Sequence, residues 1–201
     1  MSTIGILGSG RVATALTNKL ATAGHEVTLG TRNADALNWT GAPIAIADYE
    51  STARGAQIII NATPGDGAIE RLGALAAALE NKILIDVSNP HNPSGSDPSL
   101  AEQLQAALPT TRVVKTLNTM FFTVMADPHS LRTPPTAFLS GNDASAKAVV
   151  TALLTDLGWP TEWLEDLGDI STARGTEALM LLVPSLIRNR GFAPFALTIA
   201  A

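Results

Sequence analysis

The feature that most constrains the fold is a glycine turn placed between a short strand and a helix. An apolar run at residues 4–7 leads directly into Gly8-Ser9-Gly10-Arg11-Val12-Ala13, and residues 11–23 keep helical spacing of apolar positions. In the G-x-G-x-x-G/A pattern, the first glycine makes the turn and the second lets the backbone approach a pyrophosphate. The free N–H groups at the helix start favour phosphates. The stretch predicts dinucleotide binding by Gly8, Ser9, Gly10, Arg11 and Val12.

The rest of the chain continues as short apolar strands alternating with helices, to about residue 165. Such alternation favours right-handed βαβ units on a parallel sheet. The predicted fold is α/β, a Rossmann-type doubly wound and mainly parallel sheet with a small C-terminal helical extension. The expected strands lie at residues 4–7, 26–29, 44–46, 57–62, 82–87, 112–117 and 136–140, and the expected helices at 11–23, 48–54, 68–79, 100–107 and from 143 to 157.

The end of the second predicted strand indicates which dinucleotide is bound. An acidic residue usually holds the ribose of NAD there, but this chain has Gly30, Thr31, Arg32 and Asn33. The missing carboxylate removes repulsion of a 2′-phosphate. The Arg32 guanidinium offers a planar fork of donors that suits a phosphate, and Thr31 and Asn33 add further donors. The sequence therefore predicts a preference for NADP, whereas the alternative is that Arg32 is an ordinary surface residue.

Ligands of open parallel sheets bind beyond the carboxyl ends of the strands, where the strand order reverses. Three further strand ends carry residue types that suit such a site, although the same types are also common in turns. We expect the first two ends to line the path of the cofactor and the third to line the substrate pocket. They are Ala62-Thr63-Pro64, Val87-Ser88-Asn89-Pro90 and Leu117-Asn118-Thr119-Met120, and residues 91–98 are expected to form a loop.

The C-terminal part breaks the alternation. Residues 171–190 form one long, mostly apolar helix pattern that Ser171 can cap, Pro184 should kink and Gly191 can end. We therefore divide the chain into an NADP-binding domain at residues 1–165 and a C-terminal helical segment at 166–201. The segment is expected to supply substrate-site and dimer contacts. The acidic residues at 162–169 are expected to form a solvated connection.

Composition excludes several classes of function. A net charge of -5 argues against nucleic-acid binding, and the absence of cysteine excludes thiol chemistry, disulfides and cysteine-based metal sites. The three histidines show no metal spacing, so no metal site is predicted. No apolar run is long enough for a membrane span and no signal peptide is visible, which predicts a cytoplasmic protein without a membrane partner.

Few residues offer acid–base chemistry. His91 follows the expected cofactor strand end, and Asn118 and Thr119 are the other catalytic candidates. Lys115 is a candidate proton donor or, alternatively, a strand residue whose long side chain reaches out to solvent.

Over nearly its whole length the chain resembles the NADP oxidoreductases that use the deazaflavin coenzyme F420. The last two of the matching segments are the most particular to that family. The segments are residues 4–13, Gly30-Thr31-Arg32-Asn33, Asp86-Val87-Ser88-Asn89-Pro90, Lys115-Thr116-Leu117-Asn118-Thr119, Gly158-Trp159 with Asp166-Leu167-Gly168, and Ala173-Arg174.

The resemblance implies hydride transfer between NADPH and a second ring, a deazaflavin or a flavin, held against the nicotinamide. It further implies that Thr31 and Arg32 hold the 2′-phosphate, that residues 118–120 line the pocket of the second ring, and that the protein is a homodimer. Two alternatives stay open. One is reduction of a small carbonyl or imine, with His91, Lys115 or Thr119 as proton donor, and the other is a non-enzymatic NADP-sensing module.

Overall fold

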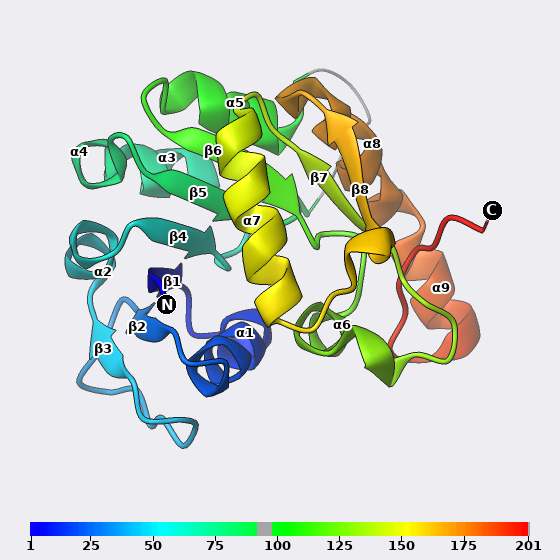
Figure 1. The fold of residues 1–201 in the computed structure, drawn as a ribbon, viewed down its shortest axis with the longest axis horizontal. Coiled ribbons are helices and arrows are strands. Elements are labelled where there is room, and N and C mark those ends of the chain that lie inside the picture. Colours follow the sequence, from blue (N-terminus) through cyan, green and yellow to red (C-terminus); the bar gives the residue numbers. More distant parts are fainter. Residues whose placement is uncertain (92–97, 201) are drawn as a thin grey trace.

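The computed structural model describes residues 1–91 and 98–200, and within them the strands form one eight-stranded sheet (Figure 1). The strand order is β3-β2-β1-β4-β5-β6-β7-β8. The first six strands in the chain pair in parallel, β7 runs antiparallel to β6, and β8 runs parallel to β7. The predicted Rossmann-type, mainly parallel fold is confirmed. The strands are β1 Thr3–Leu7, β2 Glu26–Gly30, β3 Ala45–Ala47, β4 Ile58–Asn61, β5 Ile83–Asp86, β6 Arg112–Thr116, β7 Ala137–Ser140 and β8 Leu164–Gly168.

Helices cover both faces of this sheet. Most lie where the sequence predicts them, but the expected helix at 68–79 is divided in two near Gly73, a poor helix-forming residue. The α-helices are α1 Arg11–Thr22, α2 Tyr49–Gly55, α3 Ala68–Gly73, α4 Ala76–Leu79, α5 Leu100–Ala107, α6 Phe122–Ala126, α7 Ala144–Asp156, α8 Ala173–Ala178 and α9 Val183–Arg190. Short 3-10 turns are η1 Pro128–Ser130, η2 Thr161–Trp163, η3 Ile170–Thr172 and η4 Leu179–Leu181.

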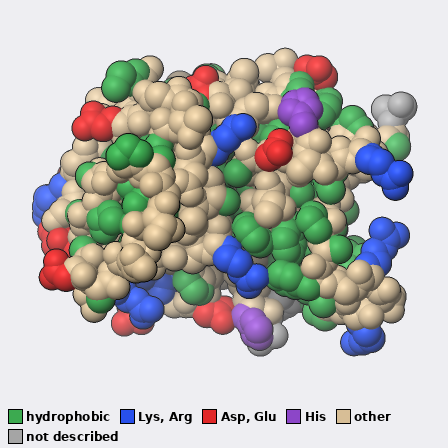
Figure 2. Space-filling view, turned by 90° about the horizontal axis from the view of Figure 1, so that it is seen from below, with side chains coloured by type: hydrophobic (Ala, Val, Ile, Leu, Met, Phe, Trp, Pro, Cys, Tyr) green, Lys and Arg blue, Asp and Glu red, His purple; other side chains and the backbone are tan. Residues whose placement is uncertain are grey.

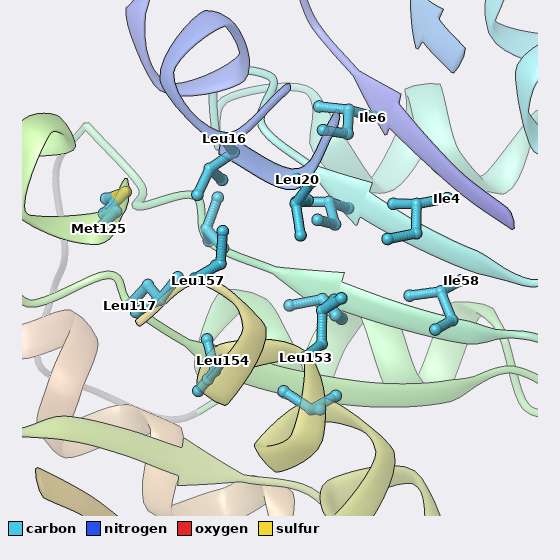
Figure 3. Close-up of a cluster of buried hydrophobic side chains, with 14 of the residues drawn as sticks. Ile4, Ile6, Leu16, Leu20, Ile58, Leu117, Met125, Leu153, Leu154 and Leu157 are labelled. Carbon is cyan, nitrogen blue, oxygen red and sulfur yellow. The ribbon is translucent and has the colours of Figure 1, made fainter. Parts of the chain in front are cut away.

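The core consists of two apolar clusters, one on each face of the sheet. Helices α1, α6 and α7 pack on one face, where Ile4 and Ile6 of β1 meet Leu16 and Leu20 of α1 (Figure 3). Helices α2 to α5 cover the other face. Successive strand residues point to opposite faces, so the continuous apolar runs of the central strands are buried on both sides.

The C-terminal part differs most from expectation. Residues 164–168 form strand β8 beside β7, so the prediction of a connection at 162–169 is wrong, although the acidic residues there are exposed to solvent as expected. This strand also crosses position 165/166, where we divided the chain; the division stays a prediction. The expected helix at 171–190 is interrupted by η4 and resumes as α9, with Pro184 in its first turn and Gly191 at its end. Asp169, rather than Ser171, caps the start.

No helix in the described ranges is both long and apolar enough to cross a bilayer.

Candidate functional site

A cavity of about 940 Å³ lies at the carboxyl ends of β1, β4, β5 and β6. The strand order reverses between β1 and β4, which is where ligands of doubly wound sheets bind. Residues 179–197 form the opposite wall. Most of the predicted site residues line the cavity: Gly8, Ser9, Gly10, Arg11, Val12, Arg32, Ala62, Thr63, Pro64, Asn89, Asn118, Thr119 and Met120. Thr31, Asn33, Pro90 and His91 are not among the described lining residues.

The glycine turn forms one end of the cavity and has the geometry of an anion site. Gly8 has φ +119°, and a Cβ there would lie 2.7 Å from the Ala62 carbonyl oxygen, so only glycine fits. A Cβ at Gly10 would meet nothing within 4 Å, which leaves room for a ligand against the backbone. Helix α1 starts at Arg11 without a side-chain cap and without an acid in its first turn. Its first N–H groups and the positive end of its dipole are therefore available to a phosphate.

The end of β2 presents a cation to this part of the cavity. Arg32 is exposed on the cavity wall, and none of the described lining residues is Asp or Glu. Thr31 is buried behind the wall, where its hydroxyl donates to Ser9 Oγ at 3.3 Å. Asn33 Oδ1 accepts the Ala36 N–H at 3.3 Å. Arg32 thus lies at the cavity, after β2, where the sequence predicted it. Thr31 does not line the cavity and instead contacts the glycine turn through its hydrogen bond to Ser9.

A buried hydrogen-bond network supports the floor of the cavity. Asp86 Oδ1 accepts from Ser88 Oγ at 2.7 Å and from Asn61 Nδ2 at 2.8 Å. The Thr63 hydroxyl donates to Asn61 Oδ1 at 2.6 Å. Since Ser88 and Thr63 line the cavity, the network fixes the orientation of two hydroxyl groups at the ends of β4 and β5.

Lys115 lies beneath this floor and is 1% exposed. Its Nζ contacts Asp86 Oδ2 at 2.7 Å, Glu177 Oε1 at 3.0 Å and the Ser88 carbonyl oxygen at 2.5 Å. Neither interpretation of Lys115 from the sequence is right: the side chain does not reach solvent, and it does not line the cavity. Lys115 instead connects the sheet to Glu177 of α8, the helix that leads into the opposite wall.

A second ion pair holds α8 to α5. Nε and Nη2 of the Arg174 guanidinium donate to Glu102 Oε2 and Oε1, at 2.7 and 2.6 Å. These bonds, with those from the Ser99 cap, lower the pKa of Glu102 to about 2. Glu177 accepts the N–H groups of Leu100 and Ala101 at the start of α5, at 2.8 and 3.1 Å. The wall at 179–197 therefore begins from a firmly attached helix.

The ends of β5 and β6 are joined by a reciprocal amide pair. Asn118 Nδ2 donates to Asn89 Oδ1 at 2.9 Å, and Asn89 Nδ2 donates to the Asn118 carbonyl at 2.7 Å. Leu117, just before this pair, has φ +59°, a conformation that non-glycine residues adopt at a cost and that often marks a functional site. Thr119 Oγ1 is buried and has no hydrogen-bond partner in the described residues. His91 is exposed, and its backbone N–H donates to Asp66 at 3.0 Å.

The part of the cavity next to Arg11 is aromatic and apolar. Four of the chain's five phenylalanines line it: Phe121, Phe122, Phe192 and Phe195. The Phe121 ring centroid lies 4.8 Å from that of Phe122 and 4.9 Å from that of Phe192. The Phe121 N–H donates to the Phe195 carbonyl at 2.8 Å, which attaches the C-terminal segment to the loop after β6.

The sequence did not identify these phenylalanines as site residues, nor Tyr49 or Met125. The usable signal was the concentration of phenylalanine in two short segments, in a chain with only 4% aromatic residues. The segments are about 70 residues apart in the chain, and only tertiary structure brings them together.

The fold is of the Rossmann class, its cavity lies where such folds bind dinucleotides, and comparisons with known proteins identify the family of the chain. Residues 3–90 match the model of the NADP oxidoreductases dependent on coenzyme F420. A solved structure from Arthrobacter sp. FB24, described as a candidate F420-dependent NADP reductase, is 39% identical with a TM-score of 0.89, each chain being covered completely. A hypothetical protein of Sinorhizobium meliloti is 25% identical, with a TM-score of 0.70 over 86% of this chain and 88% of that one.

Among curated proteins, the metalloreductase STEAP3 of Rattus norvegicus is 30% identical over 90% of this chain. The chain spans 37% of the length of that relative. The chain belongs to the family of F420-dependent NADP oxidoreductases, as the resemblance in its sequence predicted. By family it is an NADP-dependent oxidoreductase.

Proposed function

We propose that the chain transfers a hydride between NADPH and a second ring cofactor, a deazaflavin such as coenzyme F420 or a flavin. The observation that carries the proposal is the division of one cavity into two chemically different ends. One end has a glycine turn, an uncapped helix start and Arg32, and the other has four phenylalanines. A phosphate-bearing dinucleotide suits the first end and a flat apolar ring the second.

In this proposal the chain's own residues hold the dinucleotide. Gly8 and Gly10 allow its pyrophosphate to approach the start of α1, and Arg32 donates to its 2′-phosphate. Ala62, Thr63, Pro64 and Asn89 line its path toward the nicotinamide. When bound, NADPH supplies a hydride from its nicotinamide ring.

The second ring is proposed to lie between the nicotinamide and the wall at 179–197. Asn118, Thr119 and Met120 line its pocket. Holding two rings face to face demands orientation and exclusion of water, which the apolar wall provides.

The cavity supports ring reduction better than reduction of a carbonyl or imine. Its described lining contains no Asp, Glu, Lys or His, and Tyr49 at the start of α2 is the one side chain of acid–base type there. Of the sequence candidates, His91 lies outside that lining and Lys115 is bound by two carboxylates. Thr119 alone remains at the cavity, and a hydroxyl is a weak acid.

The test is oxidation of NADPH with coenzyme F420, with flavin mononucleotide and with a panel of imines. The proposal predicts turnover with one of the ring acceptors and none with the imines. Turnover of imines alone would contradict it. Tight NADPH binding without turnover of any acceptor would favour the sensing module.

A variant of Arg32 tests the cofactor assignment. Replacing Arg32 with Ala should weaken the binding free energy of NADPH by about 1.5–3 kcal/mol, the value of a hydrogen bond to a charged group. The binding free energy of NADH should stay almost unchanged. Arg132, an exposed arginine outside the cavity lining, gives the matched control as Arg132→Ala. Equal losses for both cofactors in Arg32→Ala would refute the role of Arg32.

We also propose that the protein is a homodimer whose contact includes the C-terminal segment. Large apolar side chains are exposed there: Leu181 at 58%, Leu182 at 53% and Phe192 at 60%. Figure 2 views the side on which α1, α6 and α9 lie, and apolar side chains gather there with Lys and Arg side chains at their edges. Sedimentation analysis should give twice the chain mass, and Leu181→Glu should give the single mass. A monomeric native protein would contradict this proposal.

A further inference from the structure

The charged side chains that line the cavity in the described part of the chain all carry the same sign. They are Arg11, Arg32 and Arg190. The chain as a whole has a net charge of -5, so this is a local concentration of positive charge on an acidic protein. A cleft lined by one sign of charge attracts ligands of the opposite sign.

The proposed NADP site explains only part of this charge. Arg32 follows β2, whereas Arg190 ends α9, and these elements lie on opposite sides of the molecule (Figure 1). A dinucleotide whose 2′-phosphate meets Arg32 and whose pyrophosphate meets the start of α1 has no further phosphate for α9. Arg190 therefore remains unexplained at the aromatic end of the cavity.

Arg11 lies between the two ends and is held in place by aromatic rings. Its guanidinium carbon is 5.5 Å from the ring centroid of Phe122 and 5.1 Å from that of Phe192. Cation–π contacts of this kind orient a guanidinium without neutralising it. Among the described residues, neither Arg11 nor Arg190 has a carboxylate within ion-pair distance. Both can therefore donate to an anion from a ligand.

We propose that Arg190, assisted by Arg11, is a second anion-binding position that takes the phosphate or carboxylate on the side chain of the hydride acceptor. The inference rests on the function proposed above and adds a determinant of acceptor specificity. The phenylalanines select a flat ring, and Arg190 selects a ring that carries an anionic arm. An uncharged ring then binds at the same place with lower affinity.

Flavin mononucleotide and riboflavin test the inference directly, because they share one ring system and differ by a phosphate. Their dissociation constants are measured by flavin fluorescence on the full chain saturated with NADP⁺. Native protein should bind the mononucleotide at least about tenfold more tightly, the factor that one charged hydrogen bond supplies. Coenzyme F420 and its deazaflavin riboside, which lacks the anionic arm, form a second matched pair.

Arg190→Gln should bring the ratio of the two dissociation constants close to one and leave riboflavin binding unchanged. Arg188→Gln is the matched control, because Arg188 is exposed on the same helix but is not among the described lining residues. It should keep the native ratio.

Two outcomes would overturn the inference and leave the ring proposal intact: equal affinity of the native protein for both members of each pair, or a ratio that survives in Arg190→Gln. Binding of none of the four ring compounds would overturn the inference and the proposed function together.

Discussion

Replacing Lys115 with Met is expected to destabilise the fold by about 3–5 kcal/mol, the cost of removing one partner from a buried ion pair. Met has nearly the same length as Lys and fills the space, so the loss is one of charge and hydrogen bonds. Asp86 and Glu177 are 0% and 3% exposed, and without Lys115 both carboxylates would be buried with no counter-charge. Their remaining donors are Asn61, Ser88 and the N–H groups at the start of α5.

Urea unfolding followed by tryptophan fluorescence measures this cost, with the fully buried Trp159 as the main reporter. For a chain of this size each kcal/mol lowers the melting temperature by about 2–4 °C, so the expected drop is about 6–20 °C. The triple variant Lys115→Met, Asp86→Asn, Glu177→Gln removes all three charges together. It should recover most of the loss, because neutral groups need no counter-charge.

Two results would refute this reasoning. One is a loss below about 1 kcal/mol in Lys115→Met, the size of an ordinary surface ion pair. The other is a triple variant that is no more stable than the single one.

The remaining predictions concern the attachment of α8 and the glycine turn. The pKa of Glu102 lies at about 2 in the folded protein, below its ordinary value of 4.5, so its pairing stabilises the fold above pH 4.5 and this stabilisation is lost as the pH falls toward 2. Melting temperatures of Glu102→Gln should therefore fall less steeply than those of the native protein across that window, and parallel curves would contradict the assignment. Gly10→Ala should leave the melting temperature unchanged, because the added Cβ meets no protein atom within 4 Å. It should lower the affinity for NADPH about tenfold or more, because the Cβ would occupy space that the cofactor needs. Gly8→Ala should instead cost roughly 1–3 kcal/mol of stability by strain at positive φ, and the reverse pattern in the two variants would contradict the placement of the cofactor.

Hydrophobic periodicity and glycine placement were sufficient to predict β1, α1, β2 and the strand ends that meet at the cavity. These elements form from neighbouring residues, and parallel βαβ units leave little freedom in how they assemble. The failures lie where the local signal was weak or misleading. Strand β8 carries an acidic sequence that suggests solvent, and yet it pairs at the sheet edge through its backbone. The helix pattern at 171–190 is broken at η4 ahead of Pro184, which lacks the N–H that would have continued it.

The sequence alone determined the fold class, the glycine turn and the cation that replaces a ribose-binding acid, because each of these depends on residues close together in the chain. Tertiary structure alone decided the burial of Lys115 between Asp86 and Glu177, and the meeting of Phe121 and Phe122 with Phe192. These contacts join residues separated by about 30 to 70 positions, and no local pattern encodes such a distance. The charged and aromatic residues were visible in the sequence. Only the packing of α8 and α9 against the sheet decided which of their side chains share a wall of the cavity.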